Sequence, residues 1–189
     1  MKRCQWCLSD PLYVKYHDEE WGTPLKDDQK LFEFLVLETM QAGLSWLTIL
    51  KKRKNFSKAF YNFEIEKVAN FDEEKVQALL NNPQIIRNKL KIRAAVNNAQ
   101  KVLEIQKEFG SFSSFIWSFV DNQPIINNFE NIDEIPTSTA LSDKITKELK
   151  AHGFKFIGTT IIYSFMQAVG MVNDHVRDCF RSENLSTRD

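Results

Sequence analysis

The sequence predicts a compact all-α protein, one domain with two lobes. Apolar residues recur at helical spacing along most of the 189 residues, and no stretch alternates apolar and polar side chains convincingly enough for a strand. Only 6 glycines and 5 prolines interrupt this pattern. A hydrophobic content of 43% excludes a disordered chain, and the length is sufficient for one sizeable core.

The expected helices span residues 27–40, 45–55, 73–81, 85–109, 114–120, 142–152 and 159–172. Asp27 or Asp28 can cap the first of them. Residues 121–139 contain Pro124 and Pro136 and are expected to form a long connection between lobes. The domain should cover residues 1–181, and the polar residues 182–189 are expected to be a disordered tail.

The charge and the cysteine content favour a cytoplasmic protein without a membrane partner. The formal net charge is +0, and the basic runs at 51–54 and 87–93 are more often solvated helix faces than nucleic-acid sites. Three cysteines cannot all pair, and nothing resembles a secretory signal. The most apolar stretch, residues 154–172, contains Lys155 and Gln167 and suits a core helix better than a membrane span.

Cysteines and histidines gather at the two ends of the chain. Cys4, Cys7 and His17 lie near the start, and His175 and Cys179 lie near the end. On a helix the last two would project from one face, one turn apart. Two cysteines and two histidines are a common tetrahedral ligand set for structural Zn²⁺, so a zinc ion is expected to fasten the N-terminal arm to a C-terminal helix. The alternative is a group of buried free cysteines with two hydrogen-bonded histidines.

An acidic residue falls on an apolar helix face. Leu31, Leu35 and Glu38 are spaced at i, i+4 and i+7, and a carboxylate on such a face is costly unless it is paired or functional. Aromatic residues are dense nearby: Trp6, Tyr13, Tyr16, Trp21 and Trp46. A carboxylate among aromatic faces suits a flat cationic ligand. The alternatives are a solvated Glu38 at the rim and an ordinary aromatic core.

Two glycine-containing turns are further candidates. Gly43 should end the helix of residues 27–40 and leave Leu44 at the break. Gly153 and Gly158 flank a short apolar turn that contains Lys155 and precedes a helix. Free N–H groups at a helix start bind phosphate, although an ordinary corner between two helices is the commoner structure.

Together these segments resemble the family of 3-methyladenine DNA glycosylase I, the constitutive type, within the helix-hairpin-helix DNA glycosylase superfamily. The matching strings, which cover nearly the whole chain, are Arg3-Cys4, Asp10-Pro11-Leu12-Tyr13, Tyr16-His17-Asp18, Glu20-Trp21-Gly22, Gln41-Ala42-Gly43-Leu44-Ser45-Trp46, Trp117-Ser118-Phe119-Val120, Ile135-Pro136-Thr137-Ser138-Thr139, Gly153-Phe154-Lys155-Phe156, Ser164-Phe165-Met166-Gln167-Ala168 and Val172-Asn173-Asp174-His175-Val176. The resemblance implies a monomeric, monofunctional enzyme of bacterial base-excision repair. Such an enzyme flips out and hydrolyses 3-methyladenine from double-stranded DNA, leaving an abasic site. It also implies a helix-hairpin-helix motif at about residues 142–172 and one structural zinc ion.

The resemblance assigns residues to three sites. The metal ligands fall on Cys4, His17, His175 and Cys179, with Cys7 close enough to compete with Cys4. The base pocket falls on Trp6, Tyr13, Tyr16, Trp46 and the catalytic Glu38. The DNA contacts fall on Gly43, Leu44, Gly153, Lys155 and Gly158, where Leu44 fills the gap left by the extruded nucleotide.

In one position the chain differs from the wider superfamily. Many members carry a catalytic aspartate just ahead of the His-Val pair, and on that alignment Asn173 takes its place. An amide cannot stabilise an oxocarbenium-like transition state by charge, and methylation at N3 explains why less help is required, because it makes adenine a good leaving group. No lysine is placed for a Schiff base, so strand cleavage is not expected.

Two other functions share some of these features. A helical DNA-binding module held by zinc would share the turn and the metal site but gives no reason for an acid among aromatic residues. A zinc hydrolase would need a three-ligand site, and the chain has no His-Glu-x-x-His string.

Overall fold

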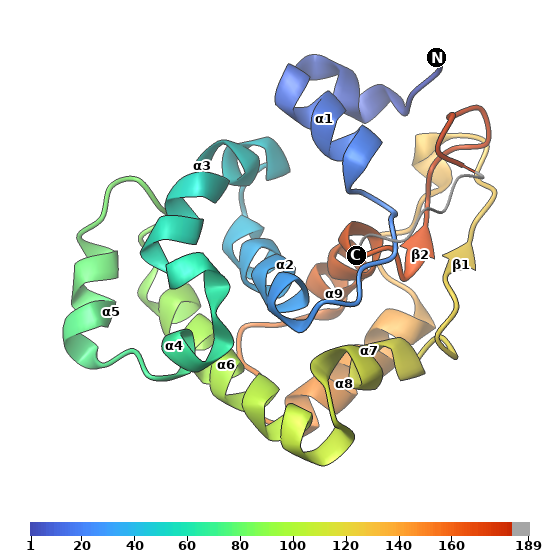
Figure 1. Ribbon diagram of the computed structural model, residues 1–189. Coiled ribbons are helices and arrows are strands. Elements are labelled where there is room, and N and C mark those ends of the chain that lie inside the picture. Colours follow the sequence, from blue (N-terminus) through green and yellow to red (C-terminus); the bar gives the residue numbers. More distant parts are fainter. Residues whose placement is uncertain (183–189) are drawn as a thin grey trace.

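The computed structural model describes residues 1–182 and is built almost entirely of helices (Figure 1). The α-helices are α1 Pro11–Glu19, α2 Asp28–Gln41, α3 Trp46–Ala59, α4 Ile65–Ala69, α5 Glu73–Leu80, α6 Lys89–Phe109, α7 Phe112–Ser118, α8 Ala140–Ala151 and α9 Thr159–Ala168. Three short 3-10 helices, η1 Gln5–Ser9, η2 Tyr61–Phe63 and η3 Ile132–Glu134, join them. No helix in this part of the chain is long and apolar enough to cross a membrane. The predicted tail, apart from Ser182, lies outside the described residues.

All seven predicted helices are present, with shifted ends. Side-chain caps set several starts: Asp27 caps α2, Ser45 caps α3, and Asn88 caps α6. The cap at Asn88 explains why α6 begins at Lys89 and not at residue 85. Two helices were missed. One is α1, which begins at Pro11 after Asp10, whose side chain accepts a hydrogen bond from the Leu12 amide. The other is α4, which is too short for its periodicity to be recognised.

The expectation of a chain without strands was wrong in one place. Strand β1 (Ile125–Ile126) pairs in parallel with β2 (Val172–Asn173) and ties the connection of residues 121–139 to the end of the chain. Helix α9 therefore ends at Ala168, before the predicted residue 172. Gly170 makes the turn with a φ of +72°, and a Cβ there would lie 2.3 Å from the backbone of Thr23, so only glycine fits.

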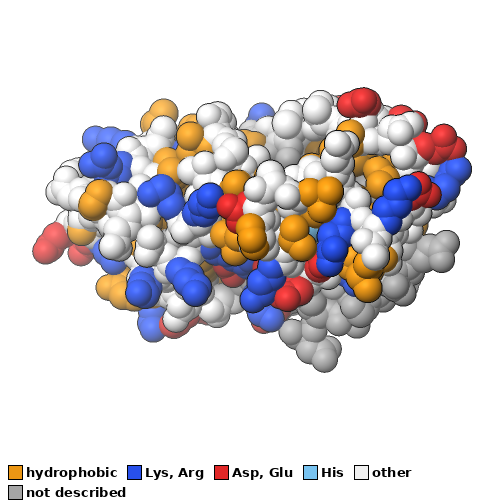
Figure 2. All heavy atoms as spheres, turned by 90° about the horizontal axis from the view of Figure 1, so that it is seen from above, with side chains coloured by type: hydrophobic (Ala, Val, Ile, Leu, Met, Phe, Trp, Pro, Cys, Tyr) orange, Lys and Arg blue, Asp and Glu red, His pale blue; other side chains and the backbone are white. Residues whose placement is uncertain are grey.

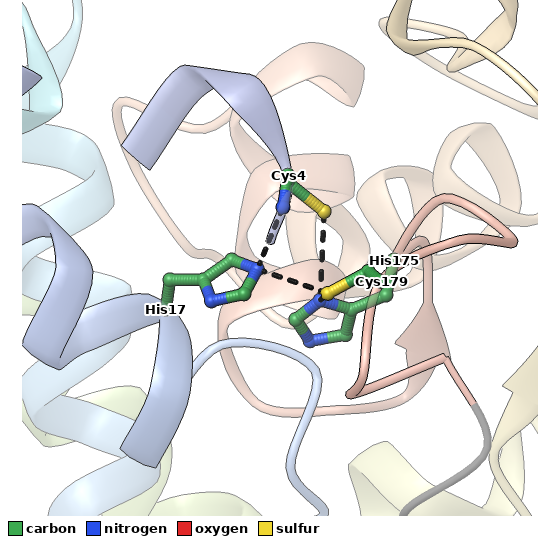
Figure 3. Close-up of side chains that lie close together, drawn as sticks. All are labelled: Cys4, His17, His175 and Cys179. Carbon is green, nitrogen blue, oxygen red and sulfur yellow. Dashed lines mark hydrogen bonds between the residues drawn. The ribbon is translucent and has the colours of Figure 1, made fainter. Parts of the chain in front are cut away.

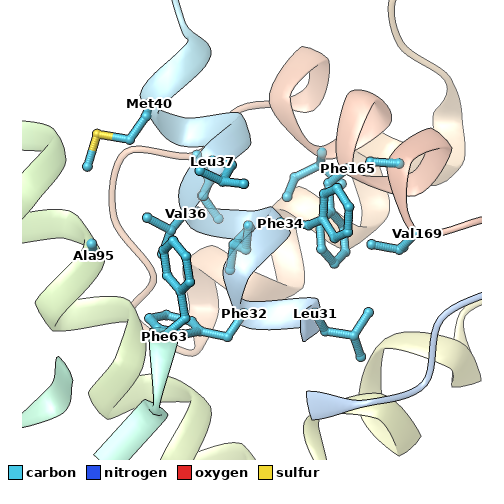
Figure 4. Packing of buried hydrophobic residues seen from close by; sticks show 14 of the residues in the cluster. Leu31, Phe32, Phe34, Val36, Leu37, Met40, Phe63, Ala95, Phe165 and Val169 are labelled. Atoms are coloured by element: carbon cyan, nitrogen blue, oxygen red, sulfur yellow. The ribbon is translucent and has the colours of Figure 1, made fainter. Parts of the chain in front are cut away.

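Helix α2 is surrounded by the rest of the protein, and α3, α6 and α9 pack against it (Figures 1 and 4). Its apolar side chains are buried on every side: Leu31, Phe32, Phe34, Leu35, Val36, Leu37 and Met40. A helix that is apolar all round is a buried helix. The one acidic residue in its last turns, Glu38, is therefore carried into the interior.

Helices α8 and α9 pack against each other and are joined by the turn of residues 152–158. Thr139 caps α8 through a reciprocal pair of hydrogen bonds with Ser142. The turn is fastened to α6, because the Asn98 side chain accepts from the Lys155 amide at 2.8 Å and donates to the Lys155 carbonyl at 3.0 Å. This anchoring gives the turn a fixed position relative to α2 and α6.

Candidate functional site

A cavity of about 330 Å³ opens between the N-terminal segment, α2, α9 and the connection of residues 121–139. Its lining residues are Trp6, Tyr13, Tyr16, Trp21, Glu38, Gln41, Trp46, Ile132, Ile135, Pro136, Thr137, Thr160, Tyr163, Ser164 and Gln167. All five residues that the resemblance assigned to the base pocket thus line one cavity. The wall from α9 was missed, although Thr160, Ser164 and Gln167 form a polar stripe at i, i+4 and i+7 on a mostly apolar helix.

Glu38 is a buried carboxyl on the wall of this cavity. Only 4% of the residue is exposed, and its Oε2 is buried without a hydrogen bond from any described residue. Burial raises the pKa of Glu38 to about 8. The solvated position at the rim is thus excluded. A carboxyl in this state binds strongly to a ligand that brings N–H donors and positive charge.

Aromatic rings surround this carboxyl. The Trp6 ring centroid lies 5.1 Å from Tyr13 and 5.0 Å from Trp21, and Tyr16 lies 5.4 Å from Trp46. The Trp46 Nε1 is also buried without a partner in the described chain. The π-faces of such rings attract flat and cationic groups. The cavity is therefore built for a planar ring with a polar edge.

Leu44 comes between Gln41 and Trp46 in the sequence, two residues that line the cavity, but its own side chain is exposed. Gly43 has a φ of +81° and ends α2 as predicted, and 42% of Leu44 remains accessible.

Lys91, predicted to lie on a solvated face, is instead 5% exposed. Its Nζ donates to the carbonyl oxygens of Met40 and Ala42 at 3.0 and 2.6 Å, which fixes the end of α2.

The turn between α8 and α9 leaves backbone donors free. Among the described residues, no acceptor is present for the backbone N–H groups of residues 156–161, and the Lys155 side chain is exposed beside them. On the face that carries α1 and α3, Lys and Arg side chains lie among apolar and acidic ones (Figure 2). An anion at this turn would be bound by the free backbone N–H groups and the Lys155 side chain.

Four buried side chains from the two ends of the chain converge on one point (Figure 3). The ligand atoms of Cys4, His17, His175 and Cys179 all lie within 4.8 Å of one another. Cys179 Sγ lies 3.4 Å from His17 Nε2 and 3.5 Å from His175 Nδ1, and Cys4 Sγ lies 3.7 Å from His175 Nδ1. A zinc tetrahedron with bonds of about 2.0–2.3 Å has edges of roughly 3.3–3.8 Å. The four residues could hold such an ion.

The other ring nitrogen of each histidine is fixed by a hydrogen bond. The His17 Nδ1 lies 2.8 Å from Asp18 Oδ1, and the His175 Nε2 lies 3.0 Å from the Trp21 carbonyl oxygen. Each imidazole thus turns its unprotonated nitrogen to the cluster, as metal-binding histidines do. A hydrogen bond from the Cys4 thiol lowers the pKa of the Cys179 thiol.

Comparison with known proteins assigns the chain to a family. The family model described as Methyladenine glycosylase matches residues 6–182. The chain belongs to this family. DNA-3-methyladenine glycosylase 1 of Escherichia coli (strain K12) is 51% identical over 179 residues, 95% of this chain and 96% of that protein. DNA-3-methyladenine glycosylase of Haemophilus influenzae is 45% identical over 177 residues, 94% of this chain and 96% of that protein.

Solved structures agree with this membership. A crystal structure of 3-methyladenine DNA glycosylase I matches with a TM-score of 0.92 and 52% identity, covering 95% of this chain and 98% of that one. The Staphylococcus aureus enzyme, solved to explain its recognition of 3-methyladenine, matches with a TM-score of 0.94 and 40% identity, covering 98% and 99% of the two chains.

The structure of this methyladenine glycosylase differs from the predicted metal site in two details. Cys7 is buried but lies outside the four-residue cluster, and its thiol donates to the Cys4 carbonyl oxygen at 3.1 Å. The predicted C-terminal helix is absent, because residues 174–180 form an irregular loop with turns. His175 and Cys179 lie close together because the loop folds back on itself. Their proximity was predicted, but from a helix that residues 174–180 do not form.

Asn173, which the resemblance aligned with a catalytic aspartate of other glycosylases, does not line the cavity. Asn173 is fully buried, and its side chain donates to the carbonyl oxygens of Arg181 and Ser182 at 3.3 and 3.1 Å. Its Oδ1 accepts from the His175 amide at 3.1 Å. Asn173 thus supports the loop that carries His175. The next residue, Asp174, accepts hydrogen bonds from Tyr163 and Gln167, two residues of the cavity wall.

Proposed function

We propose that this methyladenine glycosylase removes 3-methyladenine from alkylated double-stranded DNA by hydrolysis and leaves an abasic site. It would act as a monomeric, monofunctional enzyme of bacterial base-excision repair in the cytoplasm. The observation that carries this proposal is the buried, unpartnered Glu38 in an aromatic cavity. The names of the relatives support it, since each is a 3-methyladenine glycosylase.

The proposed mechanism follows from the shape and charge of the cavity. The nucleotide is extruded from the duplex, at a cost of a few kcal/mol that is smaller for a damaged base. The aromatic rings stack on the base, and Glu38 accepts a hydrogen bond from its amino edge while its charge matches that of the cationic purine. The bond between C1′ and the base nitrogen then breaks, its electron pair stays on the departing base, and the base leaves as a neutral molecule. Water adds to C1′ and loses a proton.

Two exposed features are proposed to hold the duplex. Helices α8 and α9 with their turn would form the helix-hairpin-helix motif, in which Gly153, Lys155, Gly158 and the free backbone N–H groups bind phosphates. Leu44, presented by Gly43, would fill the space left by the extruded nucleotide and offset part of the cost of extrusion. The cavity lies between these helices and the end of α2, so we place the boundary of the two lobes there.

Replacing Lys155 with alanine is expected to weaken DNA binding about equally with and without a lesion, because it removes a phosphate contact. The slope of log K against log salt should become shallower by about 1. Titrations of labelled duplexes at several salt concentrations measure this. Lys107→Ala, which removes an exposed lysine near the end of α6, is the matched control and should keep the parent slope. A lesion-dependent loss in Lys155→Ala would contradict the proposed phosphate contact.

Replacing Leu44 with alanine is expected to slow excision by about tenfold, since the extruded state loses the side chain that fills the duplex. The affinity for free 3-methyladenine should not change, because Leu44 does not line the cavity. Single-turnover excision and free-base binding, measured on the same preparation, test both statements. Equal losses in the two measurements would place Leu44 in base recognition.

The kcat/KM of excision is expected to rise with pH through a midpoint near pH 8 and to level off about one unit above it. The pKa of Glu38 is about 8, so below this pH the carboxyl is mostly protonated and cannot match the fixed charge of the alkylated base. The midpoint should appear in kcat/KM, which reports the free enzyme. In kcat it should lie lower, because the bound cation favours the carboxylate. A kcat/KM profile that is flat from pH 6 to 9 would exclude Glu38 as the group that matches the charge.

We also propose that Cys4, His17, His175 and Cys179 hold one structural Zn²⁺. The edges of the cluster and the hydrogen bonds that fix both imidazoles support this assignment. Four protein ligands leave no open position for a substrate water, so the ion would fasten the two ends of the chain and take no part in the reaction. Residues of the aromatic cavity perform the chemistry.

The main rival is a helical DNA-binding module without catalysis. It predicts binding of alkylated duplex with no base set free, whereas the proposed enzyme releases 3-methyladenine. An assay for free base by the purified protein therefore distinguishes the two.

A further inference from the structure

A second polar group reaches the cavity from α9. Gln167 lines the cavity, and its Nε2 donates to Asp174 Oδ2 at 2.8 Å. No described residue donates a hydrogen bond to the Gln167 Oε1, and this oxygen is not among the fully buried atoms. Because the side chain is half-buried at the cavity wall, this oxygen is the part of Gln167 that a bound base can reach.

Asp174 determines which end of the amide faces the cavity. The Asp174 side chain is fully buried, and it accepts hydrogen bonds from the Tyr163 hydroxyl at 2.7 Å, from Gln167, and from Asn127 Nδ2 at 2.7 Å. A carboxylate only accepts hydrogen bonds, so Gln167 must turn its NH₂ group to Asp174 and its oxygen away from it. The Tyr163 hydroxyl donates its one hydrogen bond to the same carboxylate, so it cannot donate a hydrogen bond to a ligand.

We infer that the Gln167 Oε1 is a second acceptor in the base pocket that selects 6-aminopurines over 6-oxopurines, and that Asp174 is the residue that positions it. This inference rests on the proposed function. The amino group of 3-methyladenine has two hydrogens, one for Glu38 and one for Gln167. A 6-oxopurine places a carbonyl oxygen at the same point, so acceptor faces acceptor and the buried lone pairs stay unsatisfied.

The test compares two free bases of nearly the same shape. 3-Methyladenine and 3-methylhypoxanthine differ only at the 6 position and in a proton on an imidazole nitrogen of the 6-oxo base, and quenching of the pocket tryptophans reports their binding. The parent should prefer 3-methyladenine. Gln167→Met keeps the length of the side chain and removes the oxygen, so the preference should fall about tenfold, through weaker binding of 3-methyladenine.

Asp174→Asn tests the positioning role with the shape preserved. An asparagine can present either its oxygen or its NH₂ group, so the Gln167 amide can turn over. The preference should then fall, and 3-methylhypoxanthine should bind more tightly than it does to the parent, a gain that a general loss of structure would not produce. Asn127→Ala is the control, since it removes a donor to the other carboxylate oxygen outside the cavity and should keep the parent preference.

Three outcomes would overturn the inference. If Gln167→Met keeps the parent preference, Gln167 does not read the 6 position. If it weakens both bases equally, Gln167 only packs against the ligand. If the parent binds and releases 3-methyladenine without any preference over the 6-oxo base, the proposed function stands and the inference is wrong, whereas a parent that binds neither base refutes both.

Discussion

Replacing Glu38 with glutamine is expected to slow the excision of 3-methyladenine by about 100-fold or more. Removing one preorganised group that stabilises charge in a closed site typically costs about 10²–10³ in rate. Glutamine keeps the shape and one acceptor but cannot match the charge of the alkylated base. Binding of free 3-methyladenine should weaken as well, because a charge-assisted hydrogen bond is replaced by a neutral one. Single-turnover rates and free-base affinities of parent and variant measure the effect.

The same substitution should leave the fold as stable as before or make it more stable. Because burial raises the pKa of Glu38 from 4.5 to about 8, the folded protein holds a proton there that the unfolded chain releases between these values. Stability from this group is present below about pH 4.5 and is lost as the pH rises through 8. At pH 9 the glutamine variant should therefore be more stable by about 1–3 kcal/mol, part of the gain being offset by its buried amide. Glu74→Gln, at an exposed position, should change neither stability nor rate. A Glu38→Gln protein that excises at the parent rate would contradict the proposed mechanism.

Replacing Cys179 with serine should have the largest effect on stability. The substitution removes one of four proposed zinc ligands, and the binding free energy of a structural zinc ion is also folding free energy. A loss of several kcal/mol lowers the Tm of a chain of this size by about 10 °C or more, at about 2–4 °C per kcal/mol. Zinc content by elemental analysis and Tm by thermal unfolding test this. Excision per folded molecule, measured well below the Tm, should fall much less than in Glu38→Gln.

Cys7→Ser is the matched control for the metal site. The Cys7 thiol is buried like that of Cys179, but it bonds to the Cys4 carbonyl oxygen and not to the cluster. The variant should keep its zinc content and lose little stability. Purified protein that holds no metal in the absence of chelators would refute the zinc proposal, and loss of zinc in Cys7→Ser would move the ligand role toward Cys7.

Most of the fold follows from local signals in the chain. Seven helices were predicted because their apolar periodicity and caps, such as Asp27 and Ser45, act over only a few residues. The short strands were not predictable, since β1 and β2 depend on a pairing between residues 125 and 172 that no local pattern encodes. The loop of residues 174–180 was likewise mistaken for a helix, because spacing at i and i+4 does not distinguish a helix from a chain that folds back.

The site was predictable where a residue conflicts with its surroundings. Glu38 on an apolar face and clustered cysteines and histidines are costly arrangements, and both fall where the sequence placed them. The α9 wall was missed because its polar stripe resembles an ordinary half-buried helix face. The role of Asp174 depends on three donors from α9 and the 121–139 connection, so it becomes visible only once these segments are packed together.

The most direct test of the proposed enzyme is release of free base from methylated duplex DNA by the purified protein at about pH 8. We expect 3-methyladenine to appear in a single turnover and the strands to stay intact until alkali cleaves the abasic sites. Glu38→Gln should release the same base far more slowly while binding the duplex. DNA that is bound by the parent without any free 3-methyladenine would contradict the account and leave a DNA-binding module.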